Sequence, residues 1–168
     1  MSPDERDTDQ GGATTYNLLF VCTGNTCRSP LAMVIARSEA ERRAWKHVAV
    51  ESAGVAAAPG APASAGAVQV AAERGLDLSN HTARPLTREL VEWADLVLAM
   101  SPSQIIGVSE LGGAEKVALV TDFIDGEGRG VPVEDPFGAD TEAYRRTFDQ
   151  LREAVVGVFD RLTPILAP

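Results

Sequence analysis

The chain has 168 residues and a formal net charge of −9 at pH 7, with 45% hydrophobic and 23% charged residues. This composition is typical of a soluble globular protein with one domain. The acidic excess argues against nucleic acid or an anionic membrane as the main partner, because little positive charge is available to displace counterions. The two cysteines, Cys22 and Cys27, are too few for a disulfide scaffold and indicate a reducing compartment.

The N-terminal segment is polar and acidic and lacks the basic start and apolar core of a signal peptide. No apolar run approaches the roughly 18–20 residues that span a bilayer. We therefore expect a disordered acidic tail at 1–15 and a single domain at 16–168. We also expect a monomeric, cytoplasmic protein that binds neither membrane nor nucleic acid.

Beyond the tail, predicted strands and helices alternate along the chain. Short apolar runs predict strands at 18–22, 48–54, 95–100 and 117–120. Helical periodicity and end signals predict helices at 29–43, 64–74, 86–93, 102–111 and 140–162. Ser29 is the expected N-cap of the first helix. The alternation predicts a parallel sheet with helices on both faces, whose ligands bind at the carboxyl ends of the strands.

The segment between the first strand and the first helix reads C-T-G-N-T-C-R-S-P, from Cys22 to Pro30. A Cys six residues before an Arg is a weak motif alone. A loop of this length between a strand and a helix, however, can turn successive backbone N–H groups inward, which suits a tetrahedral dianion. Gly24 is expected to take a backbone conformation that other residues resist. Arg28, at the helix start, offers a planar fork for two phosphate oxygens.

These features make Cys22 a candidate nucleophile. The helix N-terminus, the loop amides and Arg28 all favour its thiolate form, and the Ser29 hydroxyl can hydrogen-bond to the sulfur. One alternative is a buried core cysteine. A zinc site is another, but two thiols need two further ligands, and neither His47 nor His81 lies in a paired motif. We therefore expect no metal.

A cysteine that accepts a phosphoryl group needs a partner acid that protonates the leaving group. Asp135 follows the fourth predicted strand, so it should lie at the same edge of the sheet as Cys22. Pro136 stiffens this D-P-F-G loop and keeps Asp135 out of helical geometry, and Phe137 supplies an aromatic wall. An ordinary Asp-Pro turn is the alternative interpretation.

The sequence V-C-T-G-N-T-C-R-S-P near the N-terminus, together with E-D-P-F-G at 134–138, resembles the low-molecular-weight protein tyrosine phosphatases. Further family-like stretches lie at 51–54, 77–84 and 95–100, and the resemblance covers 16–163. It implies a flavodoxin-like, three-layer α/β fold. The sheet would have four parallel strands in the order 2-1-3-4, with helices on both faces.

The resemblance also implies a two-step reaction on phosphorylated proteins that uses neither metal nor cofactor. Cys22 would attack phosphorus to give a cysteinyl-phosphate while Asp135 protonates the leaving group, and Asp135 would then activate the hydrolytic water. Arg28 and the loop amides would stabilise the transition state. His81 would support the loop from behind. The phosphate-binding and pocket residues that the resemblance implies are Thr23, Gly24, Asn25, Thr26, Cys27, Ser29 and Phe137.

Two positions depart from the family pattern, and a third bears on the substrate. Met33 stands where the family usually has Glu, and the loop at 55–59 lacks the aromatic residue that usually forms the far pocket wall. Thr26 stands where tyrosine-directed relatives commonly carry an apolar residue, and C-T-G-N-T-C-R is similar to the loop of the protein-arginine phosphatases in this family. We expect phosphoarginine or phosphotyrosine as the substrate, with phosphoarginine slightly ahead.

Two other functions fit the same loop. An arsenate reductase of this fold would need resolving cysteines after Cys27, and the sequence has none. A catalytically weak phosphate-binding module would not need Cys22, Arg28 and Asp135 together. We also expect peroxide to close a reversible Cys22–Cys27 disulfide, the alternative being that Cys27 merely packs behind the loop.

Overall fold

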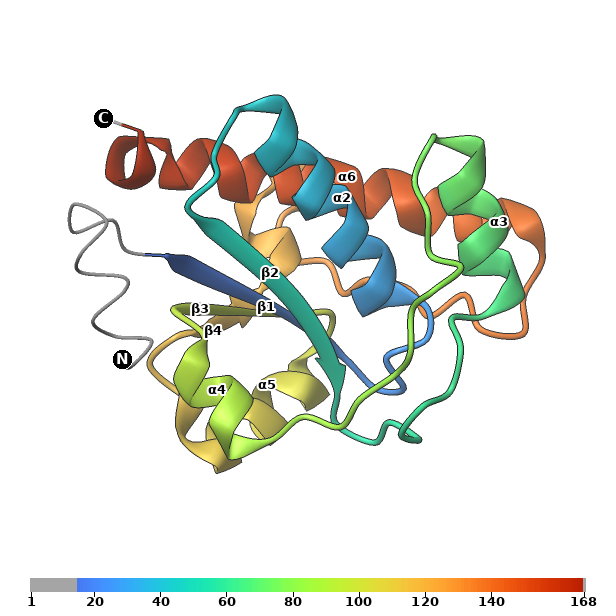
Figure 1. Cartoon of the computed structure of the whole chain (residues 1–168), viewed down its shortest axis with the longest axis horizontal. Coiled ribbons are helices and arrows are strands. Elements are labelled where there is room, and N and C mark those ends of the chain that lie inside the picture. The colour runs from blue at the N-terminus through green and yellow to red at the C-terminus, as the bar shows by residue number, and fades with distance from the viewer. Residues whose placement is uncertain (1–14, 168) are drawn as a thin grey trace, which may run out of the picture.

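The structure is a computed structural model that describes residues 15–167, so the tail expected at 1–15 lies, apart from its last residue, outside the described residues. The described chain forms three layers, with one sheet between two layers of helices (Figure 1). The sheet has four strands in the order β2-β1-β3-β4. The predicted fold class and strand order are confirmed.

The four strands run in parallel and end at one edge of the sheet. They are β1 (Tyr16–Cys22), β2 (Val48–Gly54), β3 (Leu96–Ala99) and β4 (Val117–Leu119). Cys22 at the end of β1 is level with Gly54 at the end of β2, and Val21 is level with Ala99 at the end of β3. The loops that follow these strands therefore meet at this edge, where open α/β sheets bind ligands.

Helices cover both faces of the sheet. They are α2 (Arg28–Arg42), α3 (Ala65–Glu73), α4 (Arg88–Trp93), α5 (Pro102–Val108) and α6 (Thr141–Leu166). Figure 1 shows α2, α3 and α6 on one face and α4 and α5 on the other. A widened turn (Ser109–Gly113) extends α5, and short 3₁₀ turns lie at Val120–Phe123 and Gly126–Gly128.

The start of α2 differs from the prediction. The helix begins at Arg28 with Cys27 as its N-cap, so the prediction that Ser29 caps it is wrong. Ser29 lies inside the first turn, where its hydroxyl contacts Cys22 and Asn25 instead of a backbone N–H of the helix. The N-cap therefore lies two positions nearer to Cys22 than predicted, which places Arg28 in the first turn.

Two other helix starts follow ordinary capping chemistry. α4 begins at Arg88 because the Thr87 side chain accepts a hydrogen bond from the N–H of Leu90. α6 begins after Asp140, whose carboxylate accepts from the N–H of Ala143 at 3.0 Å. A side-chain acceptor at each start satisfies a backbone donor that the helix itself cannot pair.

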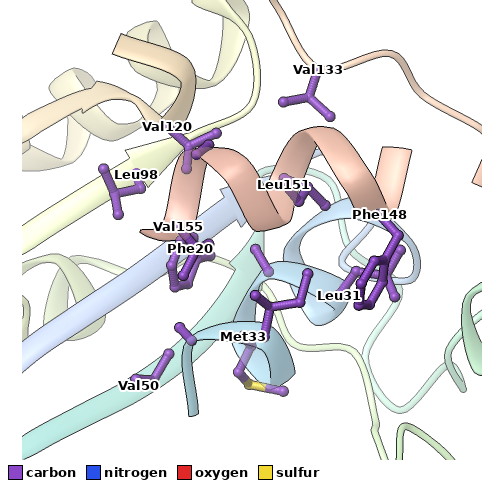
Figure 2. Packing of buried hydrophobic residues seen from close by; sticks show 14 of the residues in the cluster. Phe20, Leu31, Met33, Val50, Leu98, Val120, Val133, Phe148, Leu151 and Val155 are labelled. Carbon is purple, nitrogen blue, oxygen red and sulfur yellow. The ribbon is translucent and has the colours of Figure 1, made fainter. Parts of the chain in front are cut away.

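The core explains why β1 is a continuous apolar run. Leu18 and Phe20 belong to the cluster with α2, α3 and α6, whereas Leu19 and Val21 belong to the cluster with α4 and α5. Successive strand residues point to opposite faces, so a strand covered on both sides is apolar at every position. Figure 2 shows Leu151, on α6, among the packed side chains of the first cluster.

Replacing Leu151 with Ala tests this packing. Leu151 is fully buried, so Leu151→Ala should lower the free energy of unfolding by about 2–5 kcal/mol, because the cavity left behind cannot fully collapse. Urea denaturation measures the change. The control is Ile106→Ala on α5, where the side chain is 62% exposed and the expected change is within about 0.5 kcal/mol. Equal losses at the two sites would contradict the packing.

Candidate active site

A cavity of about 230 Å³ opens at the carboxyl end of β1. It lies between the loop that joins β1 to α2 and the loop that precedes α6. The structure brings together here eight of the residues singled out from the sequence: Cys22, Thr23, Gly24, Thr26, Cys27, Arg28, Asp135 and Phe137. Of the other three, Asn25 and Ser29 contact Cys22, which lines this cavity, and His81 contacts Asn25.

The carbonyl groups of the loop are directed away from the cavity and are paired behind it. The carbonyl oxygen of Cys22 accepts from Val55 N at 3.0 Å, that of Thr23 from Ala56 N at 2.9 Å, and that of Thr26 from Ser64 N at 2.9 Å. In a planar trans peptide the next N–H points opposite to the carbonyl. The N–H groups that follow these carbonyls are therefore turned inward, as an anion site requires.

Two hydrogen bonds converge on the sulfur of Cys22. The backbone N–H of Asn25 donates to Sγ at 3.3 Å, and Ser29 Oγ lies 2.9 Å from Sγ. Asn25 Nδ2 donates to Ser29 Oγ at 2.8 Å, which leaves the Ser29 hydroxyl hydrogen for an acceptor. The nearer acceptor is the sulfur, because Ala53 O lies 3.4 Å away. Cys22 Sγ thus accepts a hydrogen bond from the N–H of Asn25 and has the Ser29 hydroxyl as a second partner.

Asn25 holds the loop through its side chain. Its Oδ1 accepts from Arg84 N at 3.0 Å, and its Nδ2 donates to Ser52 Oγ at 2.9 Å as well as to Ser29. This pattern fixes the orientation of the amide, because a backbone N–H can only face the oxygen. Ser52 and Arg84 were not predicted as site residues, although both lie in stretches that resemble the family.

The unusual backbone conformation falls on Asn25 and not on Gly24. Asn25 has a φ of 56°, in the left-handed region that Asn tolerates better than most residues. Gly24 lies outside that region, and a Cβ built there would have only an ordinary contact, 3.7 Å from Thr26 Oγ1. The expectation for Gly24 is therefore wrong, because the Asn25 side-chain hydrogen bonds stabilise the left-handed turn one residue later.

Gly54 is a second position that sequence reasoning missed. A Cβ on Gly54 would lie 2.5 Å from Thr23 O and 2.9 Å from Asn25 N, closer than atoms can pack. Only a glycine at the end of β2 therefore lets the loop lie against the neighbouring strand. The sequence carried one signal for Gly54. This glycine ends the stretch E-S-A-G at 51–54, which closes a strand predicted to lie beside the first strand.

His81 lies behind the loop, where its Nε2 is 2.8 Å from Asn25 O. Burial lowers the pKa of His81, and the nearby positive charges of Arg37 and Arg84 lower it further, although the hydrogen bond to Asn25 O raises it. The ring is therefore neutral at pH 7, and Nε2 carries the hydrogen because a carbonyl oxygen can only accept. Met33, in place of the usual family glutamate, is buried near this ring.

Arg28 has a buried donor available for a ligand. The residue is 6% exposed, and its Nη1 donates to Val133 O at 3.2 Å. Its Nη2 lies 3.6 Å from Asp135 Oδ2. Among the described residues, its buried Nε has no hydrogen-bond partner. An unpaired buried donor is unfavourable, so an anion in the adjoining cavity would satisfy it.

Asp135 and Phe137 form the rim of the cavity opposite the loop. The Asp135 side chain is 54% exposed, and its Oδ1 accepts from Phe137 N at 3.1 Å in a tight local turn. Phe137 is 68% exposed. Val133 N donates to Met100 O at 2.9 Å, which ties this loop to the residue after β3. The carboxylate is thus accessible to a ligand and to water.

Cys27 lines the cavity and is also hydrogen-bonded on its far side. Its Sγ lies 3.0 Å from Ser64 Oγ and 3.6 Å from the Tyr144 hydroxyl, which itself donates to Ser64 at 3.1 Å. Burial raises the pKa of Tyr144 to about 12, so the phenol is neutral. Both cysteines are free, and the Cys22–Cys27 disulfide stays a prediction.

The zinc alternative for Cys22 and Cys27 requires two further ligands. Across residues 15–167, no group of three or more His, Cys, Asp and Glu side chains is placed to hold a metal ion. This part of the chain therefore has no donor set for a structural zinc.

No helix within the same residues is long and apolar enough to cross a membrane.

Comparisons with known proteins relate most of the chain to one family. A family model described as low molecular weight phosphotyrosine protein phosphatase matches residues 17–164. A protein-arginine-phosphatase of Bacillus subtilis is 44% identical over 140 residues, which cover 82% of this chain and 90% of that protein. A probable low molecular weight protein-tyrosine-phosphatase, EpsP, of Ralstonia nicotianae is 34% identical over 138 residues, with 82% and 90% covered.

A solved structure agrees with these sequence matches. It is the YwlE arginine phosphatase, in a mutant form whose active-site serine is phosphorylated. It is 38% identical to this chain, with a TM-score of 0.82, and the match covers 89% of this chain and 97% of that structure. The likeness therefore extends over the whole sheet and both helical layers.

Asn25→Ala tests whether the side-chain network forms the anion site. The change removes the hydrogen-bond partner of the Arg84 N–H and of Ser52 Oγ, takes one partner from Ser29 Oγ and removes a residue suited to a positive φ. We expect the affinity for inorganic phosphate, measured by isothermal titration calorimetry, to fall about tenfold or more, equivalent to about 1.4 kcal/mol or more. The control is the exposed Asn80→Ala. Wild-type phosphate affinity in Asn25→Ala would contradict the proposed network.

Proposed function

Because the chain belongs to the low molecular weight phosphotyrosine protein phosphatase family, we propose that it dephosphorylates proteins through a cysteinyl-phosphate on Cys22. One observation carries the mechanism. The Cys22 sulfur, the buried Arg28 guanidinium with its unpaired Nε, and the Asp135 carboxylate all border the same cavity. Nucleophile, anion receptor and acid are thereby within reach of one bound phosphoryl group.

In the first step, the Cys22 sulfur attacks phosphorus and a sulfur–phosphorus bond forms as the bond to the leaving group breaks. The two hydrogen bonds on Sγ hold the nucleophile beneath the phosphate. The inward N–H groups of the loop and Arg28 bind the phosphoryl oxygens, whose charge they stabilise in the transition state. Asp135 gives its proton to the leaving atom, so a phosphotyrosine side chain departs as a neutral phenol and a phosphoarginine side chain departs as a guanidinium.

In the second step, Asp135 has become a carboxylate and removes a proton from a water molecule. The water oxygen attacks phosphorus, the sulfur–phosphorus bond breaks, and inorganic phosphate and the Cys22 thiolate are released. The exposed position of Asp135 supports this role, because water reaches its carboxylate from the rim of the cavity. The same group thus acts as acid and then as base.

We infer that phosphoarginine is the preferred substrate. Thr26 lines the cavity, so its hydroxyl replaces an apolar contact for a phenol ring with a polar one. The loop at 55–59, V-A-A-A-P, supplies no aromatic wall. Two relatives that are 44% and 36% identical, from Bacillus subtilis and Geobacillus stearothermophilus, are named protein-arginine phosphatases. Phosphotyrosine is the second candidate, because other relatives are named tyrosine phosphatases.

We also propose that the enzyme acts in the cytoplasm. The mechanism needs a free thiol at Cys22, and Cys27 lines the same cavity. The cytoplasm is a reducing compartment, so it keeps both of these thiols from oxidising. Phosphorylated proteins are the partners that this activity requires.

Cys22→Ser tests the proposed nucleophile, and Asp135→Ala tests the proposed proton donor. Cys22→Ser should abolish turnover of para-nitrophenyl phosphate without added metal, because a serine hydroxyl does not ionise at neutral pH. Asp135→Ala should lower turnover about 10²–10⁴-fold for a poor leaving group and less for nitrophenol, which departs without a proton. The exposed Asp125→Ala serves as the control. Wild-type-like turnover by Cys22→Ser would disprove the mechanism.

Thr26→Ile tests the substrate preference. Isoleucine removes the hydroxyl, narrows the space beside phosphorus and offers an apolar surface to a ring. The ratio of kcat/KM values should shift toward a phosphotyrosine peptide by about tenfold or more, roughly 1.4 kcal/mol of differential transition-state binding. Thr15→Ile, at the opposite end of β1 from the cavity, is the matched control. An unchanged ratio in an active Thr26→Ile enzyme would remove Thr26 as the selector.

A further inference from the structure

A buried glutamine connects α5 to the phosphate loop. Gln104 is 1% exposed, and its Oε1 accepts from the backbone N–H groups of Met100 at 3.2 Å and Ser101 at 2.7 Å. Its Nε2 donates to Thr23 Oγ1 at 3.1 Å. The reaction steps use neither the Gln104 amide nor the Thr23 hydroxyl. The Gln104 amide is buried and hydrogen-bonded at both ends, so it restricts the side chain of Thr23.

The hydrogen bonds determine how the Thr23 hydroxyl is oriented. The Gln104 amide cannot be reversed, because two backbone N–H donors face its oxygen. Gln104 Nε2 is therefore the donor and Thr23 Oγ1 the acceptor. The threonine hydroxyl keeps one lone pair and one O–H for other partners. Thr23 is β-branched, with few χ1 options, so this single contact fixes its side chain.

Thr23 is exposed and lines the cavity, and Gln104 holds its hydroxyl. The chain beside it is the loop at 55–59, whose Ala56 N–H donates to the Thr23 carbonyl at 2.9 Å. The side chains of that loop are small and aliphatic or proline. This side of the cavity therefore offers a hydrogen-bond acceptor and no aromatic ring.

A guanidinium and a phenol ring would meet this rim differently. A guanidinium carries several N–H donors, one of which can pair with the free lone pair on Thr23 Oγ1. A phenol ring carries no donor on its carbon edge, so it would cover the hydroxyl without replacing the hydrogen bond to water. The rim therefore discriminates because a phenol ring covers the free lone pair of Thr23 Oγ1 without pairing it, whereas a guanidinium pairs it.

We propose that Thr23 is a second specificity-determining residue, whose Oγ1 accepts a hydrogen bond from the guanidinium of phosphoarginine, and that Gln104 is the positioning residue that holds it. The inference rests on the proposed function, because it assigns a contact with the substrate of the same site. It is separate from the role of Thr26, whose hydroxyl has no contact with Gln104 among those of the described residues.

The test compares a phosphoarginine peptide with a phosphotyrosine peptide of otherwise identical sequence. Thr23→Val is nearly isosteric and removes the hydroxyl, so it should lower the phosphoarginine-to-phosphotyrosine ratio of kcat/KM about tenfold, as expected for one hydrogen bond to a charged donor. Thr23→Ser keeps the hydroxyl and should keep the ratio within about threefold. Gln104→Met should shift the ratio in the same direction as Thr23→Val, whereas general loosening of the fold would lower both kcat/KM values together.

The outcomes separate this inference from the function on which it rests. A wild-type enzyme that cleaves phosphoarginine, with an unchanged ratio in Thr23→Val, overturns the inference alone. A wild-type enzyme that cleaves only phosphotyrosine overturns the arginine preference and the inference together. If Gln104→Met folds, as judged by its thermal denaturation, and keeps the wild-type ratio, the positioning role of Gln104 is wrong. If Gln104→Met does not fold, the comparison of Thr23→Val with Thr23→Ser decides the inference.

Discussion

The loop between β1 and α2 has to present backbone donors to an anion while it keeps its own carbonyl oxygens away. Every carbonyl turned outward must find a donor elsewhere, since an unpaired buried carbonyl is unfavourable. The structure supplies these donors from three separate segments: Val55 and Ala56 after β2, Ser64 before α3, and the His81 ring. The anion site therefore depends on the packing of those segments behind the loop, and not on the loop sequence alone.

Asn25 holds the loop in this arrangement through both its backbone and its side chain. Its left-handed backbone turns the chain, its N–H donates to the nucleophilic sulfur, and its carbonyl accepts from His81. Its side chain joins the loop to β2 through Ser52 and to the segment before α4 through the N–H of Arg84. The neutral state of His81 fits this role, because a neutral ring can donate to the carbonyl without adding a positive charge behind it.

The parallel sheet places the residues of the proposed site at one of its edges. Cys22 follows β1, Gly54 ends β2, and the Asp135 loop is tied to Met100 just after β3. Because all four strands run in the same direction, these chain segments meet without any long excursion. The helix that starts beneath the loop carries Arg28 in its first turn, so the proposed nucleophile and anion receptor come from one local unit, whereas the proposed acid comes from a distant one.

The sequence alone determined the fold class and, through the family resemblance, the strand order, and it singled out the residues proposed for the site. Apolar runs and helical periodicity are local signals, and the motif from Cys22 to Pro30 is a local unit that carries its own nucleophile and arginine. Asp135 was proposed as the acid because a loop after a parallel strand lies at the ligand edge, and the structure places it at the cavity. Apart from the strand order, these inferences needed only local patterns and spacing along the chain.

The tertiary structure alone decided how the loop is held. Ser29 lost its expected capping role because its hydroxyl faces Cys22 and Asn25, and the left-handed turn moved from Gly24 to Asn25 because three side-chain hydrogen bonds stabilise it there. The Gln104–Thr23 contact joins residues 81 positions apart. Such contacts depend on how helices pack on the sheet, and side-chain packing at that range leaves no periodic trace in a single sequence.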